Sequence, residues 1–433
     1  MTKGKFLKTL ALTLSLAVIA PFSTIVQAAE SAKDVNIVSQ AAIVMDYETG
    51  EIIYEKNAND QMYLASTTKL MTALLFAEHN KKNDSITYTQ SAKAQPEYSL
   101  DWNQMKPYGK SFTVGDTLTA DTVMKGLLLF SGNDVAYMIA DEVSGDSSSF
   151  AAKMNEKAKS LGLTETHFEN PNGLPSNGQD VNYSTAYELA LITKEAYEND
   201  WIRETLLLSD ATVTLPKNTQ VKLENRNTEL GKNGNIGGKT GVTDKAGTCF
   251  AGIYERGGKK YITVVLKSDR NNNNTRFEDI ASMMNYSENA TRSVYKKSGE
   301  EVGTAELEYK IFRFFGPTKT ISAPIVLSEN IELYDNYINN NEAQILVNSE
   351  ENNAWKVASQ DETTLSLSVK QFSTEIKGHV EISTFDLIKA NMLIYIAILV
   401  VIVIIIVLIL FIIKMISNRN RRKNSYNKRR RRY

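Results

Sequence analysis

The chain has 433 residues, 42% of them hydrophobic, so it is long enough for a large core and a smaller additional domain. Its formal net charge of −1 conceals an uneven distribution, because ten lysines and arginines lie in the last twenty residues and three lysines in the first eight. The rest of the chain has 36 basic and 50 acidic residues, a net charge of −14, which argues against nucleic acid as the partner of the body.

The first predicted element is a secretion signal in residues 1–28. Its lysines precede an apolar run from Leu10 to Ala20, and small residues at Val26 and Ala28 favour cleavage after Ala28. The run is uniformly apolar rather than periodic, which argues against an amphipathic first helix of the fold. We therefore expect the body of the chain to be exported.

Residues 34–295 are expected to form an α/β domain in which an antiparallel sheet combines strands from both ends of the region, with helices between them. The predicted elements are two strands around a turn in 41–54, helices in 70–79, 121–142, 149–161 and 184–198, a strand hairpin in 248–266 and a last helix in 277–295. Short alternating runs in residues 300–385 predict a small β-rich domain.

Met392–Ile413 contains 22 residues without a charge, about 33 Å as a helix, which is enough to cross a bilayer. The following residues, 414–433, are strongly basic, and positive charge stays on the cytoplasmic side. We expect a single-pass protein of the cell membrane with its body on the outer face. The basic tail is then expected to meet lipid headgroups rather than nucleic acid.

One cysteine, Cys249, serves the whole chain, so no internal disulfide can form. It lies in an apolar stretch and is expected to be a buried strand residue. The three histidines, His79, His167 and His379, are scattered without metal-ligand spacing. The sequence therefore predicts neither a metal site nor a cofactor.

Three short motifs follow one another in the body, namely Ser66-Thr-Thr-Lys69, Ser131-Gly-Asn133 and Lys239-Thr-Gly241. Single motifs of this kind are weak, because Ser293/Lys296, Ser425/Lys428 and Lys297-Ser298-Gly299 imitate them elsewhere. The ordered set is stronger because the surrounding sequence agrees. The first serine opens an apolar helix, the second follows apolar residues, and the third motif precedes a predicted hairpin.

Residues three apart share a helix face, so the Ser66 hydroxyl and the Lys69 amine are expected to meet. A serine hydroxyl is a weak nucleophile until a base takes its proton, and without a suitable histidine the base is a lysine. That lysine must be neutral. Desolvation and a nearby cation both lower a lysine pKa, and Lys239 is the candidate for the cation.

The motif set is the one known from penicillin-binding proteins and β-lactamases. The chain resembles the low-molecular-weight D-alanyl-D-alanine carboxypeptidases in particular. The resemblance covers about 41–295 and is strongest in 46–50, 65–72, 128–135, 167–174, 183–186 and 238–247. It implies a serine β-lactamase/penicillin-binding-protein-like domain with an antiparallel sheet and a helical subdomain, followed here by the small β-rich domain and one transmembrane helix.

The resemblance also implies catalytic roles. Ser66 is then the acylated nucleophile, Lys69 its general base, and Ser131 the relay that passes a proton toward the leaving amine. The backbone N–H groups of Ser66 and Val242 form the oxyanion hole, where negative charge develops during acylation.

For the substrate, the resemblance implies that Asn133 holds an amide and that Lys239 and Thr240 bind the terminal carboxylate of D-alanine. Gly238 and Gly241 leave room for the substrate strand. Relatives often carry histidine where this chain has Asn182, before the Tyr183-Ser-Thr-Ala stretch.

The expected activity is removal of the terminal D-alanine from peptidoglycan stem peptides ending in D-Ala-D-Ala, with β-lactams as covalent inhibitors. A β-lactamase is disfavoured because residues 165–175 lack the Glu-x-x-Leu-Asn pattern of the familiar serine enzymes. Transpeptidase or endopeptidase activity on the same scaffold stays open, since acceptor choice depends on pocket shape. A non-catalytic wall-binding scaffold is disfavoured because all three motifs are intact.

Overall fold

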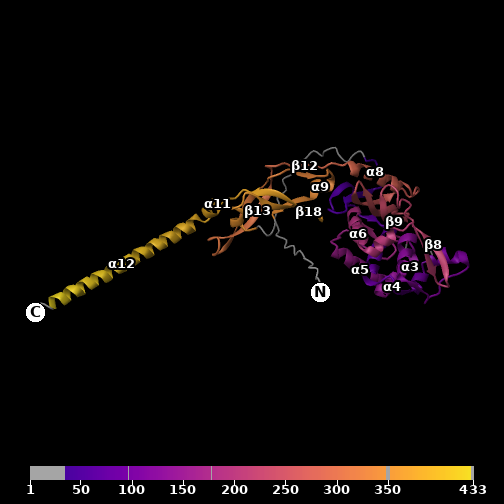
Figure 1. The fold of residues 1–433 in the computed structure, drawn as a ribbon, viewed down its shortest axis with the longest axis horizontal. Helices are drawn as coiled ribbons and strands as arrows, with labels where there is room; N and C mark the ends of the chain where they lie inside the picture. Colours follow the sequence, from indigo (N-terminus) through magenta and orange to yellow (C-terminus); the bar gives the residue numbers. More distant parts are fainter. Residues whose placement is uncertain (1–34, 96, 177, 348–351, 431–433) are drawn as a thin grey trace.

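The computed structural model describes residues 35–95, 97–176, 178–347 and 352–430. The predicted secretion signal, residues 1–28, lies outside these ranges. Figure 1 shows an elongated molecule. The region that ends with helix α8 forms one end, a second group of strands follows, and the long helix α12 forms the other end.

A five-stranded antiparallel sheet in the order β2-β1-β11-β10-β9 is the centre of the first region. Its strands are β1 Ala41–Asp46, β2 Ile52–Lys56, β9 Asn235–Thr243, β10 Gly247–Arg256 and β11 Lys259–Ser268. β10 and β11 form the predicted hairpin around Gly257-Gly258, and Cys249 of β10 is buried as predicted. β9 lies at one edge of the sheet.

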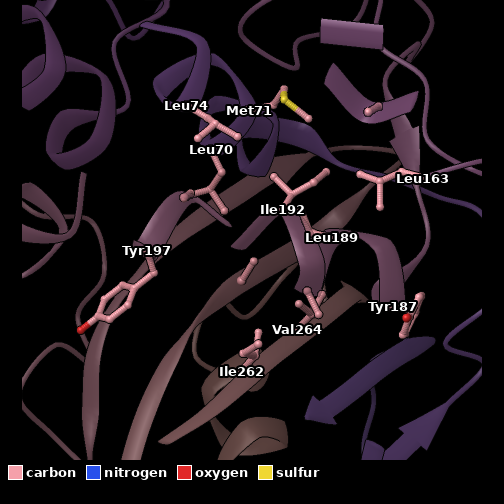
Figure 2. Close-up of a cluster of buried hydrophobic side chains, with 14 of the residues drawn as sticks. Leu70, Met71, Leu74, Leu163, Tyr187, Leu189, Ile192, Tyr197, Ile262 and Val264 are labelled. Carbon is pink, nitrogen blue, oxygen red and sulfur yellow. The ribbon is translucent and has the colours of Figure 1, made fainter. Parts of the chain in front are cut away.

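Helices and short strands between β2 and β9 form a helical subdomain on this sheet. Its elements are β3 Met62–Tyr63, η1 Ala65–Thr68, α1 Lys69–His79, β4 Ser85–Thr87, α2 Gln90–Lys93, η2 Asp101–Met105, η3 Lys106–Tyr108, β5 Thr117–Thr119, α3 Ala120–Lys125, η4 Gly126–Phe130, α4 Asn133–Ser144, α5 Ser147–Ser160, β6 Tyr183–Ser184, α6 Ala186–Glu198, α7 Asp200–Leu206, β7 Asp210–Leu215 and β8 Thr219–Glu224. Figure 2 shows Leu70 and Leu74 of α1 near Leu189 and Ile192 of α6, which lie over Val264 of β11.

β1 is apolar at almost every position because both faces of the sheet are covered. Ala41, Ile43 and Met45 belong to the core shared with the helical subdomain. Ala42 and Val44 point to the other face, where α8, Thr275–Asn289, closes a second core. Strands buried on both faces lose the alternation of apolar and polar residues, which explains the continuous apolar run.

The last helix of the first region is shorter than predicted. The sequence pattern predicts a helix over 277–295, whereas α8 ends at Asn289 and Ser293–Lys296 forms strand β12. β12 pairs with β15, Ile331–Leu333, far along the chain. Val294 and Tyr295 are good strand formers, and this long-range pairing overrides the local helical pattern.

A second five-stranded antiparallel sheet, in the order β13-β14-β18-β17-β16, follows. Its elements and neighbours are β13 Glu301–Lys310, β14 Thr318–Leu327, α9 Tyr337–Glu342, β16 Ala343–Val347, α10 Ala354–Val357, β17 Thr363–Val369, β18 Phe372–Val380 and α11 Thr384–Lys389. Along β17 every second residue is buried, the pattern of a sheet with one face on a core. The β-rich character expected of residues 300–385 is thus present.

Specific hydrogen bonds join the two regions. The side-chain amides of Asn336 and Asn339 both donate to the carbonyl of Ile52, each at 2.9 Å. The Arg292 guanidinium pairs with the buried Glu51 carboxylate at 2.5 Å. Because one partner of each contact lies in the first region, the second sheet is held to it at more than one place.

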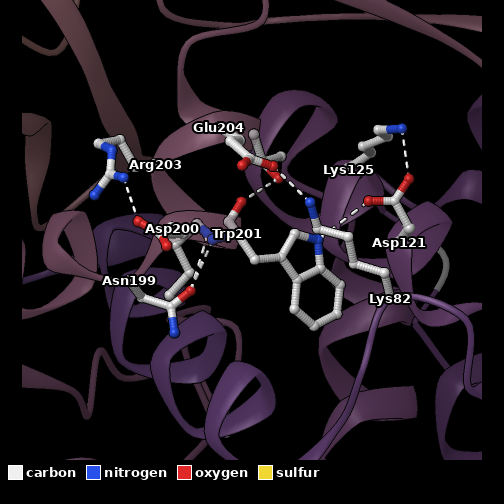
Figure 3. A network of polar contacts seen from close by, with 10 residues as sticks. Lys82, Asp121, Lys125, Asn199, Asp200, Trp201, Arg203 and Glu204 are labelled. Atoms are coloured by element: carbon white, nitrogen blue, oxygen red, sulfur yellow. Dashed lines mark hydrogen bonds and ion pairs between the residues drawn. The ribbon is translucent and has the colours of Figure 1, made fainter.

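Surface charges of the helical subdomain are paired. Figure 3 shows Lys82 beside Glu204 and Lys125 beside Asp121, each pair at 2.5 Å. The indole N–H of Trp201 donates to Asp121 at 3.1 Å and so connects α7 to α3. Exposed pairs of this kind contribute up to about 1 kcal/mol each, so the network orients α7 rather than stabilising the fold strongly.

Among the residues that the structure describes, α12, Met392–Arg430, is the one helix long and apolar enough to cross a membrane. The most apolar 18-residue window of the candidate span, Met392–Arg422, has a mean hydropathy of 4.1, and none of this window is buried inside the protein. The uncharged run predicted from the sequence forms the first part of this helix.

Candidate active site

Ser66 lies in η1, a single turn of 3₁₀-helix that leads directly into α1. The preceding residue, Ala65, has a left-handed φ of 48°, so the chain bends sharply before the hydroxyl. Lys69 is the first residue of α1. Its Nζ lies 3.0 Å from Ser66 Oγ, so the predicted meeting of hydroxyl and amine is present.

Two glycines approach this turn closely from different segments. A Cβ at Gly173, where φ is 80°, would lie 1.9 Å from the carbonyl oxygen of Ala65. A Cβ at Gly241 would lie 2.9 Å from the carbonyl oxygen of Leu64 and 3.0 Å from the amide nitrogen of Ser66. Real Cβ atoms do not approach backbone this closely, so only glycine fits either position without displacing the turn.

Lys69 is fully buried and has three polar neighbours. Besides Ser66 Oγ, its amine contacts the side-chain oxygen of Asn133 and the backbone carbonyl of Asn172, each at 2.8 Å. Both of these oxygens are acceptors. A neutral amine, which has two N–H groups and one lone pair, therefore gives its N–H groups to the two acceptors and keeps its lone pair for the Ser66 hydroxyl.

Burial lowers the pKa of Lys69 to about 7, and the positive charge of Arg226 adds to this effect. Burial also lowers the pKa of Lys239 well below its ordinary value, with further lowering by Lys69, Arg226 and Arg276. The sequence predicts Lys239 as the cation that keeps Lys69 neutral, and the structure adds Arg226, whose charge lowers the pKa of Lys69 after the larger effect of burial. Lys239 loses its own proton readily, while an arginine keeps its charge when buried.

Ser131 and Asn133 lie where η4 ends and α4 begins. Ser131 has a left-handed φ of 70°, which interrupts the helical region predicted over 121–142. The Lys239 amine donates to Ser131 Oγ at 2.9 Å. The Asn133 amide donates to the carbonyl of Glu97 at 2.8 Å while its oxygen faces Lys69. This break therefore brings the second motif into contact with residues of both other motifs.

Lys239–Val242 lie on β9, the edge strand of the first sheet. Lys239 is 1% exposed, and its amine also donates to the carbonyl of Thr240 at 2.9 Å. The expectation for Gly238 differs from the structure. A Cβ there would lie 2.4 Å from the Phe250 ring, so Gly238 accommodates β10.

A cavity of about 700 Å³ opens over these elements. The predicted site residues that line it are Ser66, Ser131, Asn133, Thr240, Gly241 and Val242. Lys69 and Lys239 lie behind this wall and reach it through the hydroxyls of Ser66 and Ser131. The eight residues named from the sequence thus form one connected group around one cavity.

Three cavity-lining arginines belong to no motif of the sequence, and one of them, Arg270, pairs with Asp244 at 3.1 Å. Arg226 lies over the rings of Tyr98 and Phe130, 4.7 and 5.0 Å from their centres. Arg276 is 6% exposed, its Nη1 lies 3.5 Å from the carbonyl of Gly241, and burial lowers its pKa to about 10. Neither guanidinium forms an ion pair with any carboxylate in the described ranges. Arg276 is a buried cation without a carboxylate partner in these ranges, which is costly and favours an anionic ligand in the cavity.

Asn182, where relatives often carry histidine, organises the loop that contacts Lys69. It is 3% exposed, and its side-chain oxygen accepts from the backbone of Glu169 at 2.8 Å. Its amide donates to the carbonyl of Asn170 at 2.9 Å and to Thr68 Oγ1 at 3.2 Å. A neutral amide therefore ties the loop to the Ser66 turn, and this position does not contribute a titratable group.

Together the geometry combines an accessible hydroxyl, a neutral amine beside it and a cavity with cationic walls. An amine with a lone pair directed at a hydroxyl activates a serine for attack on a carbonyl. The cations favour a ligand that carries a carboxylate. The arrangement suits acyl transfer from such a ligand to Ser66.

Comparisons with known proteins agree with this chemistry. A family model described as D-alanyl-D-alanine carboxypeptidase, peptidase S11, matches residues 26–270. The chain is 30% identical to the D-alanyl-D-alanine carboxypeptidase DacF of Bacillus subtilis over 301 residues, which is 68% of this chain and 74% of the relative. It is 34% identical to a D-alanyl-D-alanine carboxypeptidase of Streptomyces sp. strain K15, over 58% of this chain and 87% of that protein.

Solved structures are similar as well. The D-alanyl-D-alanine carboxypeptidase of Mycobacterium tuberculosis H37Rv matches with a TM-score of 0.54 and 28% identity, covering 60% of this chain and 95% of that one. A mutant of the Streptomyces K15 DD-transpeptidase matches with a TM-score of 0.51 and 30% identity, over 58% of this chain and 98% of that one. The expected fold class is therefore correct for the first region, while the family match ends before the second sheet.

Proposed function

This chain belongs to the family of D-alanyl-D-alanine carboxypeptidases, which are serine hydrolases, and we propose that its cavity removes the terminal D-alanine from peptidoglycan stem peptides through an acyl-enzyme on Ser66. One observation carries the proposal. The Lys69 amine, with a pKa near 7, has acceptors for both of its N–H groups and leaves its lone pair to the Ser66 hydroxyl.

In the acylation step, Ser66 Oγ attacks the carbonyl carbon of the last peptide bond while its proton passes to Lys69. The new bond joins Oγ to the acyl group of the penultimate D-alanine. The bond to the terminal D-alanine breaks, and its amine leaves with a proton relayed by Ser131. Water then hydrolyses the ester and releases a stem peptide shorter by one residue.

The oxyanion that forms during the attack needs two positioned donors. We assign the backbone N–H groups of Ser66 and Val242 to this task. The assignment is supported by the close approach of Gly241 to the Ser66 turn, which brings β9 and the nucleophile together. A larger residue at position 241 would separate the two donors.

We assign the terminal carboxylate of the substrate to Arg276, Lys239 and Thr240. Arg276 is the buried cation whose Nε has no partner among the described atoms. An arriving anion favours the charged form of Lys239 and reverses the effect of burial on its pKa. The sequence names Lys239 and Thr240 for this role but not Arg276. Asn133 remains our assignment for the amide of the substrate.

A second candidate is transfer of the acyl group to an amine instead of water. It is favoured by the similarity to a protein named as a DD-transpeptidase. Both reactions share the acyl-enzyme, and they differ in the second acceptor. We also propose β-lactams as covalent inhibitors, because a strained cyclic amide acylates the same hydroxyl.

For location, we propose that residues 1–28 direct export, that α12 spans the cell membrane once, and that the basic residues after Ile413 stay in the cytoplasm. The catalytic region then lies on the outer face, where its substrate is. Protease added outside wall-stripped cells is expected to digest the catalytic region and spare the tail. A protected catalytic region would refute this orientation.

The catalytic proposal is tested with the full-length protein in detergent. With a peptide ending in D-Ala-D-Ala, the wild type is expected to release D-alanine, and added glycine as an acceptor amine reveals any transfer product by mass. A fluorescent penicillin is expected to label the wild type, whereas Ser66→Ala is expected to lose both label and turnover. The matched control Ser298→Ala, in the imitation motif after α8, should keep both. Label retained in Ser66→Ala would exclude Ser66 as the nucleophile.

A further inference from the structure

The turn between β13 and β14 is unusually apolar for an exposed connection. Residues 311–317 contain three phenylalanines, and Phe314 and Phe315 are 78% and 64% exposed. The ring of Phe312 stacks on that of Phe315 at 5.0 Å between centres. Turns are usually built from small polar residues, and a group of exposed aromatic rings marks a surface that meets another apolar phase.

This turn is fastened to the beginning of α12. The Tyr395 hydroxyl, in the first turn of α12, donates to the carbonyl of Ile311. The Tyr395 ring meets Phe312 edge-on at 5.7 Å. In addition, the Asn391 amide donates to the Tyr309 hydroxyl at 2.8 Å, and Lys319 donates to the Asn391 side-chain oxygen at 2.8 Å. The exposed phenylalanines are therefore held near the point where the apolar helix starts.

Basic residues flank the apolar ones. Lys310 is the last residue of β13 and Lys319 the second residue of β14, so both lie next to the turn, opposite Thr318 and Tyr309 respectively. The Arg313 guanidinium lies 5.5 Å from the centre of the Phe314 ring. Aromatic rings next to lysine and arginine are the composition of protein segments that lie at the headgroup level of a bilayer, where the rings enter the acyl boundary and the cations meet phosphates.

We propose that the β13–β14 turn is a second membrane attachment, which inserts Phe314 and Phe315 into the leaflet from which α12 enters. The inference rests on α12 as a membrane span, and not on the catalytic assignment. The continuity of the turn with the first turn of α12 selects lipid as the occupant of this surface. Arg313 and Lys310 then face lipid phosphates. The second sheet is thereby fixed in orientation to the bilayer and not only tethered to it.

Depth measurements on spin labels test this placement. The full-length protein is placed as single copies in nanodiscs of phosphatidylglycerol and phosphatidylcholine, with one nitroxide at Phe314→Cys, Tyr337→Cys or Ile402→Cys. Cys249 is buried and stays unlabelled. Tyr337, in α9, is 66% exposed and serves as the aqueous control, while Ile402, within α12, serves as the deep control.

We expect the label at 314 to collide more often with oxygen than with a water-soluble nickel chelate, at a depth between the other two labels. Equal access of the nickel chelate at 314 and 337 would overturn the proposal. So would low access of both reagents at 314, which would mean that protein covers the turn, and so would a water-exposed label at 402. Penicillin labelling of the same samples reports the catalytic site separately, so the two proposals can fail independently.

Discussion

The two five-stranded sheets of this protein bury different kinds of side chain. The first sheet is covered on both faces, and next to its edge strand it buries Lys69, Lys239 and Arg276 without a carboxylate partner in the described residues. The second sheet alternates buried apolar and exposed polar residues, and its charges are exposed or paired, as in Lys370–Glu342 at 2.9 Å.

This difference indicates that the first sheet holds the active site and that the second sheet has a structural role. Burying an ionisable group without a counter-ion destabilises a fold, so such residues persist where catalysis or ligand binding needs them. In the first region these residues, Lys69, Lys239 and Arg276, lie around one cavity. The second sheet shows no such feature in the described ranges, and its pattern is that of a structural element. Substitutions of the buried ionisable residues beside the first sheet should therefore alter the reaction rate. Substitutions in the core of the second sheet should alter the free energy of unfolding.

The largest effect is expected for Lys239→Ala. Loss of the amine that contacts Ser131 and faces the carboxylate site should reduce kcat/KM for a D-Ala-D-Ala peptide by about 100-fold to 1000-fold. The acidic limb of kcat/KM against pH should stay in place, because burial and the charge of Arg226 lower the pKa of Lys69. Lys239→Arg keeps a positive charge, but its planar guanidinium does not match the lysine amine in shape, so it should not restore the wild-type kcat/KM. An upward shift of the limb in Lys239→Ala would mean that Lys239 tunes the base after all.

A smaller effect on rate, caused by a shift of the pH profile, is expected for Arg226→Met. Lys69 acts as a base only when neutral, so the wild-type rate should fall as pH drops through about 7. Removing the Arg226 charge raises the pKa of Lys69, which moves this limb upward by roughly half a pH unit and lowers the rate about threefold at acidic pH. Arg226→Lys keeps a cation and should move the limb less. An acidic limb that does not move in Arg226→Met would show that Arg226 does not lower the pKa of Lys69.

The smallest effect on rate is expected for Leu365→Ala in the second sheet. Leu365 is fully buried on β17 opposite Ile376, so the truncation should destabilise this sheet by about 2–5 kcal/mol. The rate of acylation by penicillin, measured below the unfolding transition, should not change. Glu375→Ala, on the exposed face of β18, is the matched control and should alter neither quantity. Slower acylation in Leu365→Ala would show that the second sheet participates in catalysis.

Local patterns predicted most of the fold. The paired strands in 41–54, the helix after Ser66 and the hairpin around Gly257-Gly258 follow from turn residues and periodicity, and the structure has them. The strand at Ser293–Lys296 was missed because its partner lies beyond residue 330, and no local pattern encodes that pairing. The sequence also does not reveal that η1 precedes α1.

The residues of the candidate site were also predicted only in part. Its eight residues were named because they sit in short motifs whose spacing has a chemical reason. Arg226 and Arg276 carry no such spacing, and what distinguishes them is their place in the wall of a cavity, which packing of distant segments creates. The hypothesis that Lys239 tunes Lys69 stays a prediction, and the permanent cation Arg226, which lowers the pKa of Lys69, could not be recognised in the sequence.

Gly173 and Gly241 confine the Ser66 turn between two backbones, and this confinement limits its motion. A turn without free space on either side cannot rearrange when a ligand enters, so local opening there should be rare compared with that of the polar 271–274 loop at the cavity rim. We expect slow amide hydrogen exchange at Thr67, whose N–H donates to the carbonyl of Leu64, and fast exchange in the rim loop. Adaptation to different wall peptides or antibiotics would then come from the rim, while the nucleophile stays fixed.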